Sequence, residues 1–291
     1  MSTDQAPASR LRVVAYCILP QAYQLLTAWA RANGHKLLLV ITTPGPAVRR
    51  SSVYREIVAV APPEQDVLVT TRLRRPIPLL KSLAPDLIVS FTFPYRIPPE
   101  VTTIPRFGAV NLHPAPLPLY RGPNPMRMIY DAAPTLGATL HRTEEDFDTG
   151  VIYSRQERPM PEEVTTENVF AAWIPCMQTA LEEGVRRAVA GDPGTPQDHA
   201  SATYGAAFSE DEHWLDWNAP VRLLQCRATA VNLFAPPMRA NIDGSAYIIG
   251  TVQPLRGMRA DGPPGTVIDH SGGSFTLCAA DGVVRVEATA K

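Results

Sequence analysis

"RLRVVAYCILPQAYQLLTAWARANGHKLLLVIT", residues 10–42, decides the fold class of this chain. Its apolar runs at residues 10–19 and 35–42 are typical of buried strands. The segment between them ends in a Gly34 C-cap signal and places four apolar side chains on one helical face: Leu25, Leu26, Trp29 and Ala30. A strand–helix–strand unit winds right-handed into a parallel sheet, so the sequence predicts a Rossmann-like, doubly wound α/β fold.

Further apolar segments extend this sheet, and a second region of different character follows it. The pattern predicts a helix at 165–191 kinked at Pro175, a helix at 76–84, and strands at 66–70, 86–91, 108–113, 137–142 and 150–155. From about residue 205, short β-like segments alternate with Gly and Asp turns, which predicts a small β-rich, OB-like domain, a partly open barrel. We therefore expect a disordered tail at 1–10, a first domain at 11–200 and a C-terminal β domain at 205–291.

Composition and charge exclude several classes of protein. The chain has 291 residues, 45% of them hydrophobic, and a formal net charge of −1, so its overall charge favours no polyanionic partner. No apolar run reaches the roughly 20 residues of a membrane span, and the first residues lack the apolar core of a secretory signal. The four cysteines are far apart and match no metal-ligand spacing, which indicates a reduced, cytoplasmic protein without a metal site.

Polar side chains follow three of the predicted strands. "GAVNLHPAPLPLYRG", residues 108–122, carries Asn111 and His113 ahead of a proline-rich loop; His141 ends a later strand, and "EEDFDTG" holds Asp148. The first strand–helix turn, "YCILPQAY", has no glycine-rich phosphate loop, so the sequence does not predict dinucleotide binding. Because ligands bind at the carboxyl ends of parallel strands, we expect these polar side chains to converge there.

An amide, an imidazole and a carboxylate together suit acyl transfer to an amine. Asn111 can donate to a carbonyl oxygen that becomes an oxyanion, His113 can donate to it or move a proton, and Asp148 can hold the imidazole tautomer or accept a proton. No Ser or Cys stands beside them in the sequence, which disfavours a covalent acyl-enzyme. Each residue also has a structural interpretation: a strand-end cap for Asn111, a hydrogen-bonded histidine for His113 or His141, and a turn former for Asp148.

Two longer segments carry a resemblance to a known family. "GAVNLHPAPLPLYRGPNP" and "GATLHRTEEDFDTGVIYS", which places Asp148 35 positions after His113, resemble the folate-dependent formyltransferases. The resemblance continues through "ATYGAAF", residues 202–208, and covers nearly the whole chain. It implies 10-formyltetrahydrofolate as co-substrate. It also implies that Asn111 polarises the formyl carbonyl, that His113 stabilises the oxyanion or moves protons, and that Asp148 orients His113 and helps deprotonate the amine.

The same resemblance implies positions for the two substrates. "PDLIVSFTFPYR", residues 85–96, resembles a segment of transformylases that act on 4-amino-sugar nucleotides, with about one residue inserted near Phe93-Pro94. The implied pterin pocket is lined by residues 91–97 and 142–147. The residues assigned to the folate are Phe91, Phe93, Ile97, Arg142, Asp146 and Phe147. The residues assigned to the acceptor are Tyr95, Tyr120 and Arg121, and Arg121 could instead meet the acidic tail of folate.

Two branches of this family differ in the amine that accepts the formyl group. Enzymes acting on initiator methionyl-tRNA carry a long basic loop after the second strand, whereas "TPGPAVRRSS" here is short and offers only Arg49 and Arg50. Residues 205–291 contain seven basic and nine acidic residues, a net charge of −2. Affinity for nucleic acid rests on Lys and Arg contacts to phosphate, so this balance favours a small amine: an amino-sugar nucleotide or another metabolite.

Three other functions remain as alternatives. Formylation of methionyl-tRNA is the main one, and a hydrolase that releases formate and a folate-binding regulatory protein without chemistry are disfavoured. Hydrolytic relatives carry an additional N-terminal regulatory domain, for which a first strand starting near residue 11 leaves no room. An intact Asn111, His113 and Asp148 set argues against a protein without chemistry. The amine, the oligomeric state and the part played by the C-terminal domain are not fixed by the sequence.

Overall fold

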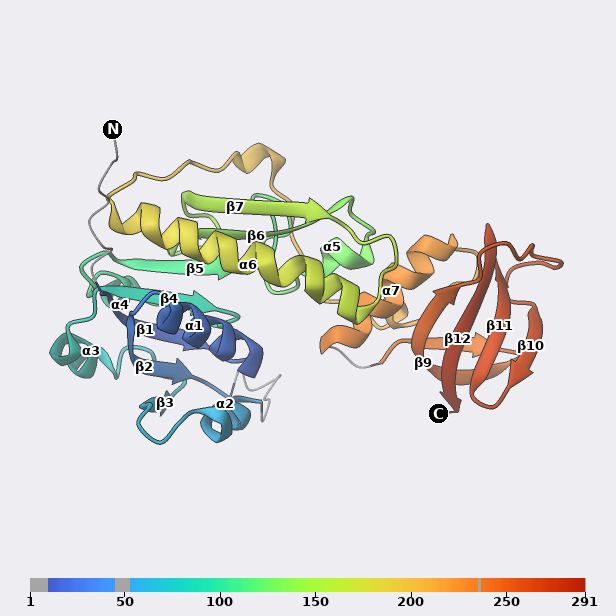
Figure 1. The fold of residues 1–291 in the computed structure, drawn as a ribbon, viewed down its shortest axis with the longest axis horizontal. Helices are drawn as coiled ribbons and strands as arrows, with labels where there is room; N and C mark the ends of the chain where they lie inside the picture. Colours follow the sequence, from blue (N-terminus) through green and yellow to red (C-terminus); the bar gives the residue numbers. More distant parts are fainter. Residues whose placement is uncertain (1–9, 45–52, 235–236, 291) are drawn as a thin grey trace. The chain divides into compact units, whose positions relative to one another are not determined.

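The computed structural model describes residues 10–44, 53–234 and 237–290 (Figure 1). The predicted tail at 1–9 and the loop arginines Arg49 and Arg50 lie outside these residues. Contacts divide the chain into two compact units. The first comprises residues up to Leu119, Ala138–Gln156 and Met177–Ala202, and the second comprises Tyr120–Gly137, Glu157–Cys176 and Thr203–Lys291. Both units are discontinuous, because two segments from within the predicted first domain cluster with the C-terminal part.

A seven-stranded sheet has the order β3-β2-β1-β4-β5-β6-β7. Its strands are β1 (Arg12–Cys17), β2 (Lys36–Thr42), β3 (Val67–Val69), β4 (Leu87–Phe91), β5 (Ala109–His113), β6 (Thr135–Arg142) and β7 (Ile152–Pro159). The helices between and after them are α1 (Pro20–Ala32), α2 (Tyr54–Val60), α3 (Ile77–Leu83), α4 (Pro99–Thr102), α5 (Arg127–Tyr130) and α6 (Thr166–Val189). The predicted Rossmann-like sheet is confirmed, and its strand order reverses at β1, between β2 and β4, where such sheets bind ligands.

One strand of this sheet departs from the expected parallel arrangement. Strands β1 to β5 pair in parallel, whereas β6 pairs antiparallel with β5. The segment between β5 and β6 contains only the four-residue helix α5 and no crossover helix. The chain therefore enters β6 at the same end of the sheet at which β5 finished, so β6 runs antiparallel to β5.

Helix α1 shows why the opening sequence folds as it does. Pro20 occupies the first turn, where its missing N–H costs nothing, and Gly34 follows the helix at a φ of +66°. Leu26, Trp29 and Ala30 are buried as predicted, together with Ala22 and Tyr23, whereas Leu25 is only partly buried. The buried face of α1 thus extends one turn further toward the N-terminus than the predicted stripe and excludes Leu25.

Helix α6 packs closely on the sheet and continues through Pro175 over 24 residues. A Cβ at Gly184 would stand 2.6 Å from the side chain of Leu140, so only glycine lets this helix approach β6 so closely. Trp173 anchors the first half of α6, because its indole N–H donates to the carbonyl of Gly137 at 2.7 Å. No helix among the described residues is long and apolar enough to cross a membrane.

The second unit ends in a five-stranded antiparallel sheet of order β10-β11-β12-β9-β8, which confirms the predicted β-rich C-terminal region. Its strands are β8 (Arg239–Ile242), β9 (Ser245–Pro254), β10 (Val267–Ser271), β11 (Ser274–Ala279) and β12 (Gly282–Ala290). Two short 3-10 turns, His199–Ser201 and Asp211–His213, and helix α7 (Val221–Phe234) precede it. Helix α7 was not predicted, because the β-like segments around it dominated the pattern.

A bidentate ion pair holds two parts of the second unit together. The guanidinium of Arg127 donates to Glu212 at 2.5 Å (Nη1 to Oε1) and 2.7 Å (Nη2 to Oε2). The same guanidinium lies over the rings of Tyr130 and Phe208, 5.2 and 5.0 Å from their centroids. The hydrogen bonds from Arg127 lower the pKa of Glu212 to about 2. The carboxylate of Glu212 is therefore a stabilising charge at neutral pH.

Candidate active site

A row of polar side chains crosses the middle of the seven-stranded sheet. Ser90 of β4 pairs in register with Asn111 of β5, and Asn111 pairs in register with His141 of β6. Ile88 and Ala109, each two residues earlier on their strands, belong to the apolar core of the same sheet face. The polar row therefore continues that apolar face. Strand register, and not loop conformation, brings these three side chains together.

Asn111 is the centre of this row, and its amide orientation is fixed by three neighbours. The hydroxyl of Ser90 donates to its Oδ1 at 2.5 Å. Its Nδ2 donates to Oδ1 of Asp148 at 3.2 Å and lies 3.1 Å from Nε2 of His141. Nδ1 of His141 contacts the carbonyl oxygen of Arg142 at 2.8 Å, and a carbonyl can only accept, so Nδ1 carries the proton. Nε2 of a neutral His141 is then an acceptor for the amide of Asn111.

The geometry around Nδ2 of Asn111 leaves one of its two N–H bonds for another acceptor. Nδ2, Nε2 of His141 and Oδ1 of Asp148 form a nearly equilateral triangle with sides of 3.1, 3.2 and 3.3 Å. Seen from Nδ2, the two acceptors lie roughly 60° apart, so one N–H bond that points between them can serve both, while the other, roughly 120° away, can serve a ligand. Among the described residues, no other acceptor binds Nδ2, and Asn111 is the only residue of the set that is not buried.

His113 and Asp148 form the second pair of the cluster. His113 follows Asn111 by two residues on β5, so both side chains point to the same face. Nδ1 of His113 lies 3.5 Å from Oδ2 of Asp148, and the two residues are 5% and 6% exposed. A carboxylate is buried at low cost only when it is paired. Here one carboxylate accepts from Asn111 and pairs with His113.

Asp148 reaches the cluster from the loop after β6. Its φ is +58°, in the left-handed region that Asp and Asn tolerate better than other non-glycine residues. A Cβ at Gly150 would stand 1.9 Å from the carbonyl oxygen of Arg142, so only glycine fits where the loop turns back. The buried Gln197 donates to the carbonyls of Asp148 (2.9 Å) and Gly150 (2.7 Å). These contacts hold the backbone that carries the carboxylate.

The proline-rich loop after His113 is tied to β6. The hydroxyl of Thr139 accepts from the N–H of Leu117 at 3.0 Å and donates to the carbonyl of Ala115 at 2.8 Å. Arg155 of β7 donates to the carbonyl of Leu117 at 3.1 Å. Proline supplies no N–H, so side chains from the neighbouring strands take the place of backbone pairing. The loop therefore holds the end of β5 in a fixed position.

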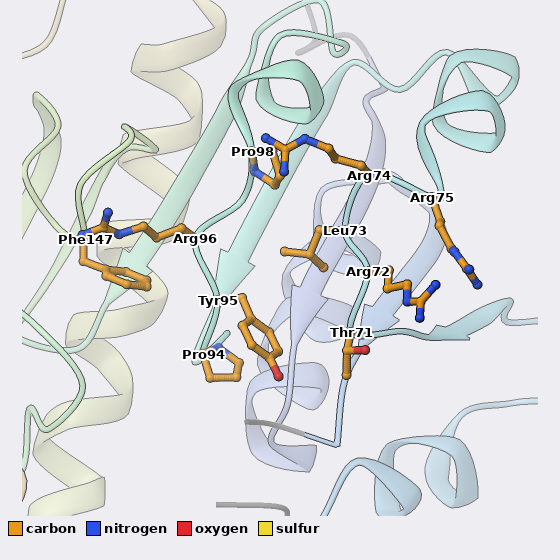
Figure 2. Close-up of a pocket in the computed structure, with 10 residues that line it drawn as sticks. All are labelled: Thr71, Arg72, Leu73, Arg74, Arg75, Pro94, Tyr95, Arg96, Pro98 and Phe147. Carbon is orange, nitrogen blue, oxygen red and sulfur yellow. The ribbon is translucent and has the colours of Figure 1, made fainter. Parts of the chain in front are cut away.

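The residues predicted to bind folate divide into core and surface groups. Phe91 and Ile97 are buried, and Phe93 packs edge-on between Tyr16 and Tyr95. Phe147 and Tyr95, the latter predicted for the acceptor, line a cavity of about 700 Å³ (Figure 2). Two other predicted residues make ion pairs: Arg142 with Glu144 at 2.7 Å, and Asp146 with Arg96 at 3.1 Å.

Two residues predicted for the acceptor lie in the second unit. The side chain of Arg121 is buried, and its backbone N–H donates to the carbonyl of Thr203 at 2.9 Å. Tyr120 donates its backbone N–H to the hydroxyl of Thr203 at 2.8 Å and has a φ of +58°. Desolvation raises the pKa of the Tyr120 hydroxyl. Their assignment to the acceptor stays a prediction.

Two positioning residues escaped the sequence analysis, Ser90 and Gln197. Ser90 is a buried hydroxyl in the otherwise apolar segment "LIVSF", and a polar residue in a central strand is a signal that could have found it. Gln197 lies in a loop 49 residues from Asp148, and no local pattern marks it. His141, whose structural and functional interpretations were equally good, belongs to the cluster.

A doubly wound sheet with an amide, two imidazoles and a carboxylate clustered at its centre places this chain among α/β proteins with a polar cluster in the central strands. Residues 20–174, more than half of the chain, match the formyl transferase family. The chain therefore belongs to the formyl transferase family. Among the described residues, no group of three or more His, Cys, Asp and Glu could hold a metal ion.

Sequence relatives and solved structures resemble this chain over most of its length. Methionyl-tRNA formyltransferase of Roseiflexus sp. (strain RS-1) is 29% identical over 214 residues, which cover 71% of this chain and 65% of the relative. The chain thus spans just under two thirds of that relative's length. HypX from Aquifex aeolicus in complex with tetrahydrofolic acid aligns with a TM-score of 0.66, 18% identity, and coverage of 96% of this chain and 44% of HypX.

A third protein matches over its whole length. The N-formyltransferase from Helicobacter canadensis, solved with folinic acid and dTDP-3-aminofucose, aligns with a TM-score of 0.60 and 14% identity. The alignment covers 95% of this chain and 98% of that enzyme. At these identities the two structural likenesses show a shared fold.

Proposed function

We propose that this chain transfers a formyl group from 10-formyltetrahydrofolate to a primary amine of a small molecule, such as an amino-sugar nucleotide. The proposal rests on Asn111, because its amide is oriented by Ser90, Asp148 and His141 and keeps one N–H bond available. That bond can donate to the formyl oxygen as it becomes an oxyanion. A preorganised donor of this kind typically contributes about 10²- to 10³-fold to turnover.

The proton path follows from the pairing of His113 with Asp148. The amine nitrogen attacks the formyl carbon, and the new C–N bond forms as negative charge collects on the formyl oxygen. The amine must then lose a proton, and the leaving N10 of the folate must gain one. Asp148 holds the Nδ1 side of His113, so the histidine and the carboxylate together can take the first proton and return the second.

The folate co-substrate fits the surroundings of this cluster. The segments 91–97 and 142–147 adjoin Ser90 and Asp148 in the chain, and both contribute aromatic side chains to one cavity. Structural neighbours are described with tetrahydrofolic acid in one case and with folinic acid and dTDP-3-aminofucose in another. These descriptions support folate as donor and an amino-sugar nucleotide as acceptor. Four buried, unpaired cysteines suit work in the reducing cytoplasm.

The deciding experiment measures tetrahydrofolate released when the protein is incubated with 10-formyltetrahydrofolate and a panel of amines. We expect turnover with at least one small amine, and loss of most turnover in Asn111→Ala, His113→Ala and Asp148→Ala. Circular dichroism checks that each variant is folded. Full activity in all three variants would refute the mechanism, and tight folate binding without transfer to any amine would favour a binding protein. Formate release without an amine would favour the hydrolase.

Methionyl-tRNA is the second candidate acceptor, because the sequence relatives include methionyl-tRNA formyltransferases. The net charge of −2 over residues 205–291 disfavours this acceptor, because tRNA is bound through Lys and Arg contacts to phosphate. Incubation with charged initiator tRNA and the folate donor separates the two candidates. Formylation of that tRNA, with a rate that falls steeply as salt rises, would replace the small amine as acceptor.

A further inference from the structure

A histidine closes the corner of the first unit where β1, α1 and β2 meet. The backbone N–H of Leu11 donates to Nδ1 of His35 at 3.3 Å, and the N–H of Lys36 donates to the carbonyl of Leu11 at 2.8 Å. Arg12 and Lys36 pair in register at the start of the parallel ladder. The imidazole of His35 therefore takes the place of a backbone acceptor for the residue that precedes β1.

This hydrogen bond decides where the neutral imidazole carries its proton. A backbone N–H can only donate, so Nδ1 of His35 accepts and Nε2 carries the proton. A second proton would have to bind at Nδ1, where it would face the N–H of Leu11. Two donors cannot form a hydrogen bond with each other. Protonation of His35 and its contact with Leu11 therefore exclude each other.

A carboxylate of α6 offers a protonated His35 a different partner. Oε2 of Glu182 accepts from Nδ2 of Asn33 at 2.6 Å, and the same Nδ2 donates to the carbonyl of Trp29 at 3.1 Å. The indole of Trp29 packs edge-on against the imidazole, with ring centroids 4.9 Å apart. The end of α1, the imidazole and α6 thus belong to one network of contacts. Its one carboxylate, that of Glu182, acts on the charge of His35.

The surroundings of His35 favour the neutral ring at neutral pH. Burial lowers the pKa of His35 below its ordinary value of 6.5, and the charge of Glu182 opposes that shift. The folded chain then binds this proton less readily than the unfolded chain. The contribution of the neutral ring to stability is fully present above pH 6.5 and is lost as pH falls through the lowered pKa. The other charged residues on and next to β1, α1 and β2 are basic and exposed: Arg10, Arg12, Arg31 and Lys36.

We propose that His35 is a pH-sensitive switch at the start of β1: the neutral imidazole holds the N–H of Leu11, and the protonated imidazole releases Leu11 and pairs with Glu182. Acid thereby loosens the start of β1, and Asn33 has to share the carboxylate that joins α1 to α6. The catalytic cluster lies on β4, β5, β6 and the loop after β6, so the switch does not depend on which amine accepts the formyl group.

The test follows hydrogen exchange of the Leu11 amide in the full chain at about pH 8 and about pH 5, corrected for the intrinsic exchange rate. We expect its protection to fall about fivefold, the effect of losing one hydrogen bond. The amide of Val14, in the middle of β1, should keep its protection. His35→Gln supplies an acceptor that does not titrate, so Leu11 should then be equally protected at both pH values. Glu182→Gln removes the partner of the protonated ring and should move the loss to lower pH.

A second measurement keeps the test independent of any variant. The nitrogen chemical shifts of His35 in the unmodified chain should show Nδ1 gaining its proton over the pH range in which Leu11 loses protection. His270→Gln is the matched control, because this exposed histidine stacks on Phe275 of the C-terminal sheet and should leave the loss unchanged.

Three results would overturn the proposal. Leu11 could be equally protected at both pH values in the unmodified chain. The loss could persist in His35→Gln, which would assign it to another group. Val14 could lose protection together with Leu11, which would show that the sheet opens as a whole and that no local switch exists.

Discussion

The hydroxyl of Ser90 donates a 2.5 Å hydrogen bond to Oδ1 of Asn111, across the parallel pair of β4 and β5. This bond fixes which end of the amide faces Asp148, since a rotated amide would bring its oxygen against the carboxylate. We therefore expect Ser90→Ala to lower kcat about tenfold and to leave KM for the donor nearly unchanged. Steady-state kinetics of the formyl transfer measure both values.

A purely structural role for Ser90 would give a different result. If Ser90 only stabilised the fold, Ser90→Ala would lower the melting temperature and leave both kcat and KM unchanged. Ser90→Thr keeps the hydroxyl and should recover part of the rate. Equal kcat in the unmodified chain and in Ser90→Ala would show that Asn111 does not need this donor.

His141 is expected to act through Asn111 as an acceptor. Nε2 of His141 receives the amide of Asn111 at 3.1 Å, and a glutamine side chain can offer its carbonyl oxygen at a similar reach. We expect His141→Gln to keep more of kcat than His141→Leu, which has no acceptor and leaves polar neighbours unpaired. Kinetics at saturating donor test this order, and the reverse order would contradict it.

Substitutions of Asp148 should separate charge from backbone conformation. Asp148→Asn keeps a side chain that tolerates the φ of +58° but removes the charge that faces His113, so kcat should fall about 10²-fold or more with the fold intact. Asp148→Ala should lose the same activity and also about 1 kcal/mol of stability, because alanine is strained in the left-handed region. Urea unfolding and kinetics on both variants measure the two effects.

Glu212 is expected to make the second unit sensitive to acid. Its pKa is lowered from 4.5 to about 2 by hydrogen bonds from Arg127, so its contribution to stability is fully present above about pH 4.5 and is lost as pH falls toward 2. Glu212→Gln should lower the melting temperature at pH 7 and flatten its fall below pH 4.5. Glu210→Gln is the control, because this exposed partner of Arg239 should contribute little. Parallel melting curves for Glu212→Gln and the unmodified chain would contradict the prediction.

The main fold and the centre of the candidate site were predictable from local patterns. The strand–helix–strand start follows from the periodicity of residues 10–42, and Asn111, His113 and Asp148 were named from residue chemistry and the resemblance to a family. The structure brings these three side chains into contact. Their roles in catalysis remain predictions that the variants above test.

Features that depend on contacts between distant residues were not predictable in this way. The reversal of β6 depends on where the chain re-enters the sheet, and the bond from Ser90 depends on the register of β4 and β5. Gln197 reaches the loop of Asp148 across 49 residues. Leu11 and His35 are 24 residues apart, and the register of β1 and β2 brings the imidazole to that N–H.

The register of β4, β5 and β6 has a consequence for how the site arises. Ser90, Asn111 and His141 are separated by 21 and 30 residues and meet only when both strand pairs are correctly aligned. A slip of one residue would turn Asn111 to the opposite face of the sheet. A sheet in which β4, β5 and β6 are misaligned therefore contains no complete polar row. Recovery of catalysis during refolding would therefore report that β4, β5 and β6 have paired in the correct register.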